Sequence, residues 1–267
     1  MTKKLKIVVL AKQVPDTRNV GKNAMTPEGT VNRAALPAIF NPEDMNALEQ
    51  ALYIKDQNPG SEVLLLTMGP FRAADIIREG LFRGADGGVL LTDRKFAGAD
   101  TLATSYALSQ AVKKINPDII LAGRQAIDGD TAQVGPQISE HLNIPVISYA
   151  QKIQIEGDSV IVERQYDDRY HVLKAKMPCL VTALAELNEP RYMTPGGIFD
   201  ACDAEITVWG RADLKDVEDS NLGLKGSPTQ IAKASDKVRK GAGEKVTLDA
   251  SESVDYILGK LKEKHII

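Results

Sequence analysis

Strand-like and helix-like segments alternate along residues 6–148, and this alternation constrains the fold more than any other feature of the chain. Short apolar runs predict strands at residues 6–11, 62–68, 88–91, 118–122 and 146–148. Helical patterns separate these runs at residues 42–56, 71–82, 100–115 and 131–142. Because parallel strands need a crossover connection, usually a helix, this order predicts an α/β fold with a doubly wound, mostly parallel sheet.

Antiparallel features follow after residue 150. The stretches 151–155 and 160–164 flank a turn at Glu156-Gly157-Asp158 and predict a β-hairpin addition, and a further strand is expected at 170–174. Residues 177–184 indicate another strand, with Pro178 near its start, where a missing N–H is tolerated. We expect residues 1–210 to form one α/β domain that includes this hairpin and a turn-rich loop at 188–197.

The segment 211–267 has a different character and is expected to be an extended C-terminal arm. Only 13 of its first 40 residues are hydrophobic, against 43% for the whole chain, so this part cannot bury enough apolar area to fold alone. Val254, Ile257, Leu258 and Leu261 then recur at helical spacing and predict an amphipathic helix at 251–264. The helix can dock on its own domain or on a partner subunit, and the length of the arm favours the partner.

Composition excludes several classes of protein. A net charge of −3 leaves no basic surface for nucleic acid. The basic N-terminus is followed by an apolar run too short for a signal peptide or a membrane span, so a cytoplasmic location without a membrane span is expected. Cys179 and Cys202 and the three histidines show no metal-ligand spacing, and we expect no metal site.

The loops at one edge of the predicted sheet share a polar, small-residue chemistry. Right-handed crossovers place the strand ends at Ala11, Met68 and Ala122 side by side. Gly123 then ends its strand without a Cβ, and Asp128 or Asp130 can cap a helix that begins near Thr131. Unpaired N–H groups at such a helix start suit an anionic ligand, although an ordinary capped connection has the same pattern.

Two common phosphate-binding motifs are absent from the sequence. No Gly-x-Gly-x-x-Gly follows the first strand, where Lys12-Gln13-Val14-Pro15-Asp16-Thr17 stands instead, and no Gly-Lys-Ser/Thr loop occurs. A nucleotide at this edge would therefore be held by other means than those of the usual dinucleotide or NTPase folds.

Several of these segments together resemble the β (small) subunit of electron-transfer flavoproteins. The resemblance runs from residue 6 almost to the C-terminus and is carried by Lys12–Asp16, Asn41-Pro42-x-Asp44, Met68-Gly69-Pro70, Arg83–Asp86, Gly123–Gly135 and Leu187–Tyr192. It implies an adenine-nucleotide-binding type of α/β fold and a heterodimer with an α subunit that carries a mobile FAD. It also implies that segment 188–197, and within it Asn188, Glu189, Pro190, Arg191 and Tyr192, docks on an acyl-CoA dehydrogenase.

The resemblance also implies which residues hold the nucleotide. Carried over position by position, they lie in the loops already expected to converge: Leu10, Ala11, Asn41, Pro42, Glu43, Asp44, Met68, Gly123, Arg124, Gln125, Ala126, Ile127, Asp128, Gly129, Asp130, Thr131, Ala132, Gln133 and Val134. We assign Asp128, Thr131 and Gln133 to side-chain contacts, and phosphate binding to backbone N–H groups.

The family has two branches, which differ in mechanism. In one, the β-subunit nucleotide is a structural AMP. In the bifurcating branch it is a second FAD, which takes a hydride from NADH and sends one electron to ferredoxin and one, through the α-subunit FAD, to an acyl-CoA dehydrogenase or enoyl-CoA reductase. The segments 12–17, 98–105 and 123–135 resemble the bifurcating branch, which adds Asp100, Thr101, Leu102 and Thr104 to the expected FAD contacts. We favour this branch.

Arg124 is the candidate cation that stabilises the reduced, anionic flavin. The alternative is a salt bridge from Arg124 to Asp128 or Asp130. No residue needs to act as a nucleophile, acid or base, because the flavin supplies the chemistry. A stand-alone adenine-nucleotide-binding protein, which needs no α subunit, is the rival that the sheet alone permits.

Overall fold

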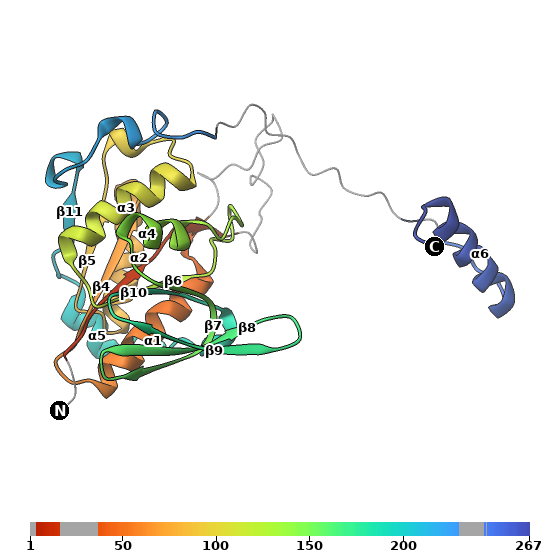
Figure 1. Cartoon of the computed structure of the whole chain (residues 1–267), viewed down its shortest axis with the longest axis horizontal. Helices are drawn as coiled ribbons and strands as arrows, with labels where there is room; N and C mark the ends of the chain where they lie inside the picture. Colours follow the sequence, from red (N-terminus) through yellow and green to blue (C-terminus); the bar gives the residue numbers. More distant parts are fainter. Residues whose placement is uncertain (1–3, 17–36, 230–242, 244) are drawn as a thin grey trace. The chain divides into compact units, whose positions relative to one another are not determined.

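A computed structural model of the chain describes residues 4–16, 37–229, 243 and 245–267. The chain divides into two compact units, Met1–Ala232 and Lys233–Ile267, and each is described by itself. Figure 1 shows the larger unit as a sheet covered by helices and the smaller one as the helix α6.

The large unit is built on a nine-stranded sheet, which confirms the predicted mostly parallel α/β fold. Its strand order is β11-β5-β4-β1-β6-β10-β7-β8-β9, and only the pairs β7–β8 and β8–β9 are antiparallel. The bounds are β1 Lys6–Leu10, β4 Glu62–Met68, β5 Gly87–Leu91, β6 Ile119–Gly123, β7 Val146–Glu156, β8 Ser159–Gln165, β9 Tyr170–Lys176, β10 Cys179–Ala183 and β11 Thr207–Trp209. Strand order reverses between β1 and β6, so a topological switch point lies there.

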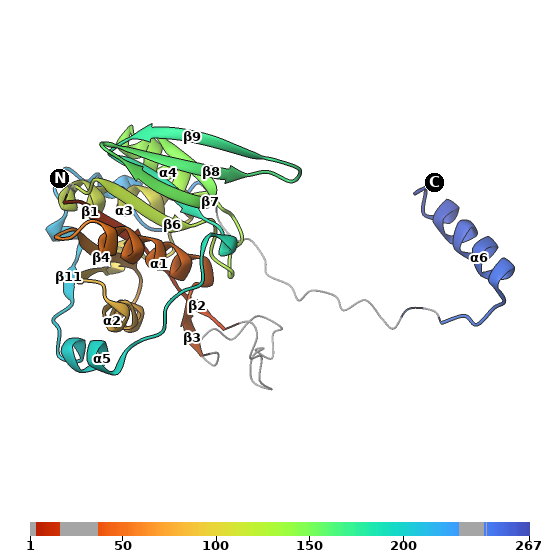
Figure 2. The ribbon, with the colours of Figure 1, turned by 90° about the horizontal axis from the view of Figure 1, so that it is seen from below.

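Helices cover both faces of this sheet, as Figures 1 and 2 show. The helices are α1 Pro42–Gln57, α2 Ala74–Arg83, α3 Thr101–Ile115, α4 Val134–Leu142 and α5 Pro195–Ala201. Helices α1 and α2 share one buried cluster with Ile7 and Val9, whereas α3 and α4 share the other with Val8 and Leu10. Successive side chains of β1 thus enter opposite cores, because a strand repeats every two residues, and the sheet is doubly wound.

Some elements differ from their predicted bounds. The helix expected at 71–82 begins with a 3-10 turn, Phe71–Ala73, before α2. The strands expected at 146–148 and 151–155 form one strand, β7, whose pairing shifts register near Tyr149. The short ribbon of β2, Gln13–Pro15, and β3, Ala38–Phe40, has no clear period in its sequence and was not predicted.

The structure places the start of the C-terminal arm later than predicted. Leu214, Val217 and Leu222 are buried in the same cluster as α3, and the Arg211 guanidinium donates to the carbonyls of Leu214 and Val217. Residues 211–229 are therefore part of the large unit. The three buried side chains attach this segment to the core, although the segment as a whole is weakly hydrophobic. Residues 230–242 and 244 of the expected arm lie outside the described residues.

The small unit consists mainly of α6, Ala250–Glu263, which confirms the predicted amphipathic helix. The Asp249 carboxylate accepts the N–H of Glu252 and caps its first turn. Val254, Ile257 and Leu258 are 41–56% exposed, so the apolar stripe is not covered within this unit. Among the described residues, no helix combines the length and apolar character that crossing a membrane would require.

Two truncations test the placement of residues 211–229. Removing 233–267 should leave the urea unfolding midpoint of the large unit nearly unchanged, because that unit keeps its core. Removing 211–267 should lower the free energy of unfolding by several kcal/mol, at roughly 1.5–3 kcal/mol for each buried side chain lost. Leu222→Ala should show part of this loss, whereas Leu224→Ala, at a 57% exposed leucine, should not. Equal midpoints for both truncations would contradict the packing described here.

Candidate nucleotide crevice

The loops after β1, β4 and β6 lie side by side at the carboxyl edge of the sheet. Leu10, near the end of β1, pairs with Leu66 of β4 on one side and with Ala122 of β6 on the other. This confirms the predicted convergence of the three loops. We call the space beyond these strand ends the crevice and residues 123–134 the crevice loop.

The first turn of α1 ties two of these loops together through Asp44. One carboxylate oxygen of Asp44 accepts the N–H of Gly123 at 2.9 Å, and the other accepts the N–H of Lys12 at 2.9 Å. The end of β6 and the end of β1 are therefore held by a single buried side chain. We call this arrangement the Asp44 clamp.

Asn41 and Glu43 hold the next part of the crevice loop. The Asn41 side chain donates to the carbonyl of Gln125 at 2.9 Å and accepts the N–H of Ile127 at 3.1 Å. Glu43 accepts the N–H of Gln125 at 3.0 Å and pairs with the Arg124 guanidinium at 2.9 Å. These bonds position the crevice loop, and the expected contacts of Asn41 and Glu43 with a nucleotide stay a prediction.

The contact between the first turn of α1 and the end of β6 leaves no room for a side chain at Gly123. A Cβ on Gly123 would lie 2.5 Å from the Asp44 carboxylate and 2.7 Å from the Asp44 backbone nitrogen. The close approach of α1 to the end of β6 thus depends on glycine. Sequence reasoning identified the glycine but not its neighbour.

Burial changes the acid–base behaviour of the clamp. It raises the pKa of Asp44 to about 7, against the opposing effect of the N–H groups of Lys12 and Gly123 and the Asn41 side chain. It also raises the pKa of Glu43, although Gln125 and Arg124 both favour the charged form. The Asp44 carboxylate is therefore well hydrogen-bonded, but burying its negative charge is unfavourable for folding.

The N-terminus of α4 has free backbone donors that face no described acceptor. Within the described part of the chain, the N–H groups of residues 131–135 make no hydrogen bond. The helix starts at Val134, three residues later than predicted, because Asp130 and Ala132 adopt left-handed φ values of 49° and 53°. Its N-cap is Gln133, without a side-chain cap, so the expected capping by Asp128 or Asp130 was wrong.

The N-terminus of α3, by contrast, is already occupied. The Asp100 carboxylate accepts the N–H of Ala103 at 3.0 Å and that of Thr229 at 3.1 Å. Thr101 donates its hydroxyl to Gln133 at 2.9 Å and so links α3 to the crevice loop, while Leu102 is 40% exposed and the Thr104 N–H bonds to the Asp100 carbonyl. Of the two helix starts proposed for phosphate, only that of α4 is open.

The charged side chains of the crevice loop pair differently from the alternative considered above. Arg124 bonds to Glu43, not to Asp128 or Asp130. Asp128 pairs with Lys12 at 2.7 Å, and Asp130 accepts the Gln125 amide at 2.9 Å. The alternative of a salt bridge within the loop is therefore wrong, because α1 brings the Glu43 carboxylate to Arg124 from a distant part of the sequence. The role of Arg124 at a flavin stays a prediction.

Further expected contact residues supply backbone or turn geometry. Leu10 and Ala11 are buried, Pro42 starts α1, and the Ala126 carbonyl accepts the N–H groups of Gly129 and Asp130. Gly129 is exposed, and a Cβ there would touch nothing within 4 Å. The predicted side-chain contacts of Asp128, Thr131 and Gln133 with a nucleotide stay a prediction.

A pocket of about 230 Å³ adjoins the crevice and includes Lys12, Met68, Arg72 and Asp128. Lys12 and Arg72 were missed at the sequence level, because neither stands in a recognisable phosphate motif. Arg72 supplies a cation here, whereas the charge of Lys12 is already paired with Asp128. With the N–H groups that have no partner among the described residues, this lining fits an adenine nucleotide with one or more phosphates. The residues present therefore fit the implied group.

The predicted docking segment is fastened to the outer face of α1. The Arg191 guanidinium pairs with Glu49 at 2.9 Å and with Asp56 at 2.9 Å, and it is only partly exposed. The Asn46 side chain donates to the Asn188 carbonyl at 2.7 Å, and the Asn188 amide donates back to the Asn46 carbonyl at 3.0 Å. Arg191 thus anchors the segment.

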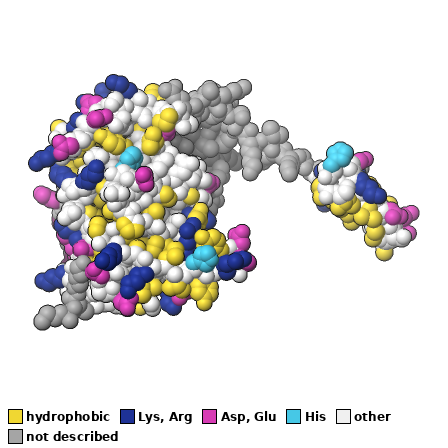
Figure 3. All heavy atoms as spheres, in the orientation of Figure 1, with side chains coloured by type: hydrophobic (Ala, Val, Ile, Leu, Met, Phe, Trp, Pro, Cys, Tyr) yellow, Lys and Arg dark blue, Asp and Glu magenta, His cyan; other side chains and the backbone are white. Residues whose placement is uncertain are grey.

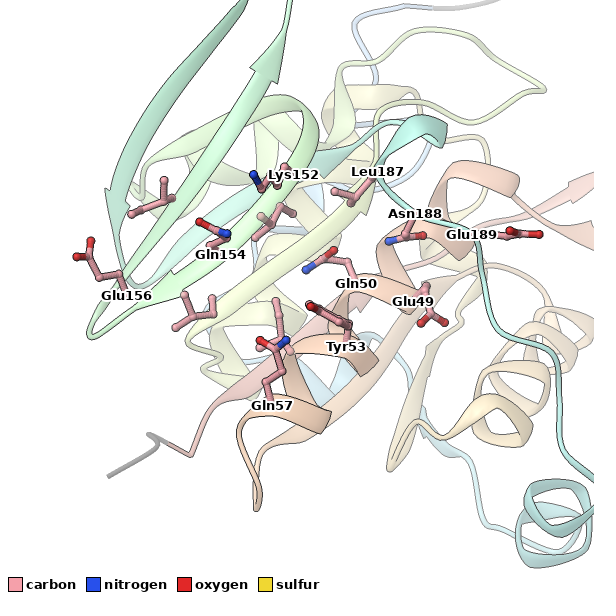
Figure 4. A pocket seen from close by; sticks show the side chains of 14 residues that line it. Glu49, Gln50, Tyr53, Gln57, Lys152, Gln154, Glu156, Leu187, Asn188 and Glu189 are labelled. Carbon is pink, nitrogen blue, oxygen red and sulfur yellow. The ribbon is translucent and has the colours of Figure 1, made fainter.

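Tyr192, next to this anchor, is 89% exposed. Glu189 and Asn188 line a pocket of about 720 Å³ between α1 and β7, where Figure 4 shows Glu49 and Gln50 beside them. This pocket shares no residue with the crevice loop or the strand ends. It lies on the side of α1 that holds the predicted docking segment, and the crevice is separate from it.

The raised pKa of Asp44 predicts a pH dependence of stability. Between its ordinary value of 3.8 and about 7, the folded chain keeps a proton that the unfolded chain loses. The free energy of unfolding should therefore fall as pH rises through this window, by about 1.4 kcal/mol per unit. Asp44→Asn should remove this slope, as shown by urea titrations at pH 4–8, whereas Asp75→Asn, at an exposed aspartate in the first turn of α2, should keep it. Equal slopes in all three proteins would mean that Asp44 is ionised throughout.

Comparison with known proteins agrees with this geometry. Residues 28–214 match the electron transfer flavoprotein domain. The electron transfer flavoprotein subunit beta of Clostridium acetobutylicum is 49% identical, and the match covers 98% of this chain and all of the relative. The caffeyl-CoA reductase-Etf complex subunit CarD of Acetobacterium woodii is 49% identical, and the acryloyl-CoA reductase electron transfer subunit gamma of Anaerotignum propionicum is 46% identical, with the same coverage.

The domain match covers more than half of the chain, and the relatives align along nearly its whole length. The chain belongs to the electron transfer flavoprotein family, among the relatives of its β subunit.

Proposed function

We propose that this β-type subunit binds FAD in the crevice, accepts a hydride from NADH, and divides the electrons between ferredoxin and an α-subunit FAD that serves an acyl-CoA dehydrogenase or enoyl-CoA reductase. The observation that carries this proposal is the row of N–H groups at residues 131–135, which have no acceptor among the described residues, with Arg72 beside the adjoining pocket. A pyrophosphate needs more donors and cations than a monophosphate.

The names of two relatives support the redox partner in this proposal. One relative is a subunit of a caffeyl-CoA reductase-Etf complex and another is an electron transfer subunit of acryloyl-CoA reductase. Both names refer to reduction of a CoA thioester. By similarity, we infer a CoA-thioester reductase as the partner of this chain as well, and a cytoplasmic site of action.

In this proposal the residues of the chain bind and orient. When bound, the FAD supplies the hydride and single-electron chemistry. Backbone N–H groups of residues 131–135 would hold its phosphates, while Asn41, Glu43 and Asp44 would keep the crevice loop in place. Arg124 would lie near the ring with its charge partly balanced by Glu43, so it would favour an anionic ring less than a free arginine would.

A structural AMP in the same crevice remains the second candidate. The capped N-terminus of α3 favours it, because Asp100 occupies donors that a longer ligand was expected to use. The two candidates differ in the nucleotides that each αβ pair releases on denaturation: two FAD, or one FAD and one AMP.

Gly129→Asp tests where the pyrophosphate lies. The position is open, so the substitution adds a carboxylate without a clash. Like charges about 4 Å apart repel by roughly 1 kcal/mol in water and several-fold more when partly buried, and 1.4 kcal/mol is tenfold in affinity. The purified αβ complex should lose one of two FAD molecules, as measured by chromatography of the released nucleotides, together with NADH-driven ferredoxin reduction.

Gly129→Asn is the matched control, because it adds nearly the same volume without charge, and it should keep both flavins. Release of one FAD and one AMP from the unsubstituted complex would reject bifurcation. Full retention of both flavins in Gly129→Asp would instead show that the pyrophosphate does not pass this turn.

The docking segment allows a second test of function. Tyr192→Ala should slow electron delivery to the acyl-CoA dehydrogenase about tenfold, without changing flavin content or melting temperature, since the side chain is almost fully exposed. Arg191→Ala should also lower the melting temperature, because it leaves Glu49 and Asp56 unpaired. Tyr170→Ala, at a 59% exposed tyrosine of β9 outside the segment and the adjoining pocket, should change neither property. Unchanged kinetics with Tyr192→Ala would show that docking uses another surface.

A further inference from the structure

The pocket between α1 and β7 has a volume of about 720 Å³ and has no role in the proposed nucleotide binding. We call it the α1–β7 pocket. Figure 4 shows Gln50 and Tyr53 of α1 lining it, with Asn188 and Glu189 toward one end and Glu156 toward the other. Ligand sites commonly have volumes of roughly 300–1,000 Å³. The pocket is therefore large enough to hold a ligand or a short segment of another chain.

Gln50 places a buried amide in the lining of this pocket. The residue is only 5% exposed, and its Nε2 has no hydrogen-bond partner in the part of the chain that the structure describes. A buried N–H donor without an acceptor is unfavourable, so an acceptor that enters the pocket makes a hydrogen bond that these residues do not supply. Because an amide also carries an acceptor oxygen, Gln50 matches a peptide group, which donates and accepts as well.

Other lining residues extend this chemistry. The side chains of Tyr53, Gln57 and Gln154 belong to exposed residues and make no hydrogen bond to a described residue. Ile54 and Ile153 are buried beside them and form an apolar wall. A peptide backbone against the amides and an apolar side chain against the isoleucines would use both parts of the lining. Such a segment must be extended, because helices and sheets pair their own N–H and C=O groups.

The charge of the lining is unbalanced. Glu49, Glu156 and Lys152 are each paired with a residue outside the pocket. The fourth charged side chain, that of Glu189, is exposed and makes no ion pair with a described residue. The unpaired charge of the lining is therefore negative, and a basic side chain complements it.

The hairpin strands also carry an exposed apolar face, whose chemistry differs from that of the pocket. Figure 3 shows hydrophobic side chains gathered over the region of β7, β8 and β9 beside charged ones, and Tyr170 and Val172 of β9 are 59% and 61% exposed. A broad apolar surface of another subunit can cover such a face. The α1–β7 pocket has a buried amide and a carboxylate instead, so it fits a narrow polar segment.

We propose that the α1–β7 pocket binds an extended peptide segment of the CoA-thioester reductase. Gln50 bonds to its backbone, Ile54 and Ile153 contact an apolar side chain, and Glu189 pairs with a basic one. The inference rests on the proposed function, which supplies the reductase as partner. It also rests on continuity with the docking segment, because Tyr192 follows Glu189 by three residues and lies at most about 11 Å from it along the chain.

Kinetics of the purified αβ complex with the reductase from the same organism test the contacts. Gln50→Leu keeps the volume but removes the amide, and it should raise the KM of the reductase for the complex about tenfold, as expected for one lost hydrogen bond between partners. Glu189→Gln, at an exposed position, should raise KM several-fold and reduce its dependence on salt.

Two matched controls lie outside the pocket. Gln151→Leu makes the same change on β7, at a half-buried glutamine that does not line the pocket, and Glu140→Gln makes the same change at an exposed glutamate of α4. Both should leave KM unchanged. Equal KM values for the unsubstituted complex, Gln50→Leu and Glu189→Gln would overturn the proposal.

Photo-crosslinking identifies the occupant directly. The photoreactive amino acid p-benzoylphenylalanine, placed at Tyr53 in the pocket, should crosslink the complex to the reductase, whereas the same amino acid at Tyr170 of β9 should not. Mass spectrometry of the crosslinked peptide should find a segment with a basic residue. A crosslink from position 53 to the α subunit, or no crosslink, would overturn the reductase as occupant.

Tyr192→Ala and the released nucleotides, measured alongside, separate this inference from the proposed function. Slower electron delivery with Tyr192→Ala, but unchanged KM with Gln50→Leu and Glu189→Gln, would overturn the pocket and leave docking on the reductase standing. A raised KM with both pocket variants, in a complex that releases one FAD and one AMP, would support the pocket and reject bifurcation.

Discussion

The carboxylate of Asp44 accepts two backbone N–H groups, from Lys12 and Gly123, and the geometry of the crevice depends on these two bonds. They join the ends of β1 and β6 at the point where strand order reverses, which is where α/β sheets bind ligands. Without them, the buried N–H of Gly123 would remain unpaired, at a cost of about 1–3 kcal/mol, and the partly buried N–H of Lys12 would lose its partner. A single side chain therefore both stabilises the edge of the sheet and shapes the crevice.

Helix α1 carries two separate surfaces of the protein. Its first turn holds the crevice loop through Asn41, Glu43 and Asp44, and its outer face holds the docking segment through Asn46 and Glu49. Because both sets of bonds are made by the same helix, the crevice and the docking segment keep fixed positions relative to each other within the large unit. The exposed Tyr192 directly follows Arg191, which α1 holds in place.

In the proposed function, the crevice would hold its nucleotide through backbone N–H groups. The left-handed residues Asp130 and Ala132 delay the start of α4, and the N–H groups of residues 131–135 find no acceptor in the part of the chain that the structure describes. A backbone site is suited to a tightly held nucleotide, because its donors need no side-chain ordering.

The sequence by itself determined the sheet, its mostly parallel order, the convergence of three loops and the amphipathic helix α6, because each follows from local periodicity and from the handedness of crossovers. Only the tertiary structure decided what the loop side chains do. Arg124 pairs with Glu43 across 81 positions of sequence, Arg191 is an anchor, and Gln50 and Gln154 line one pocket, none of which leaves a local pattern. The physical reason is that hydrophobic spacing is a short-range property, whereas hydrogen bonds and ion pairs depend on which distant segments the folded chain brings within about 3 Å.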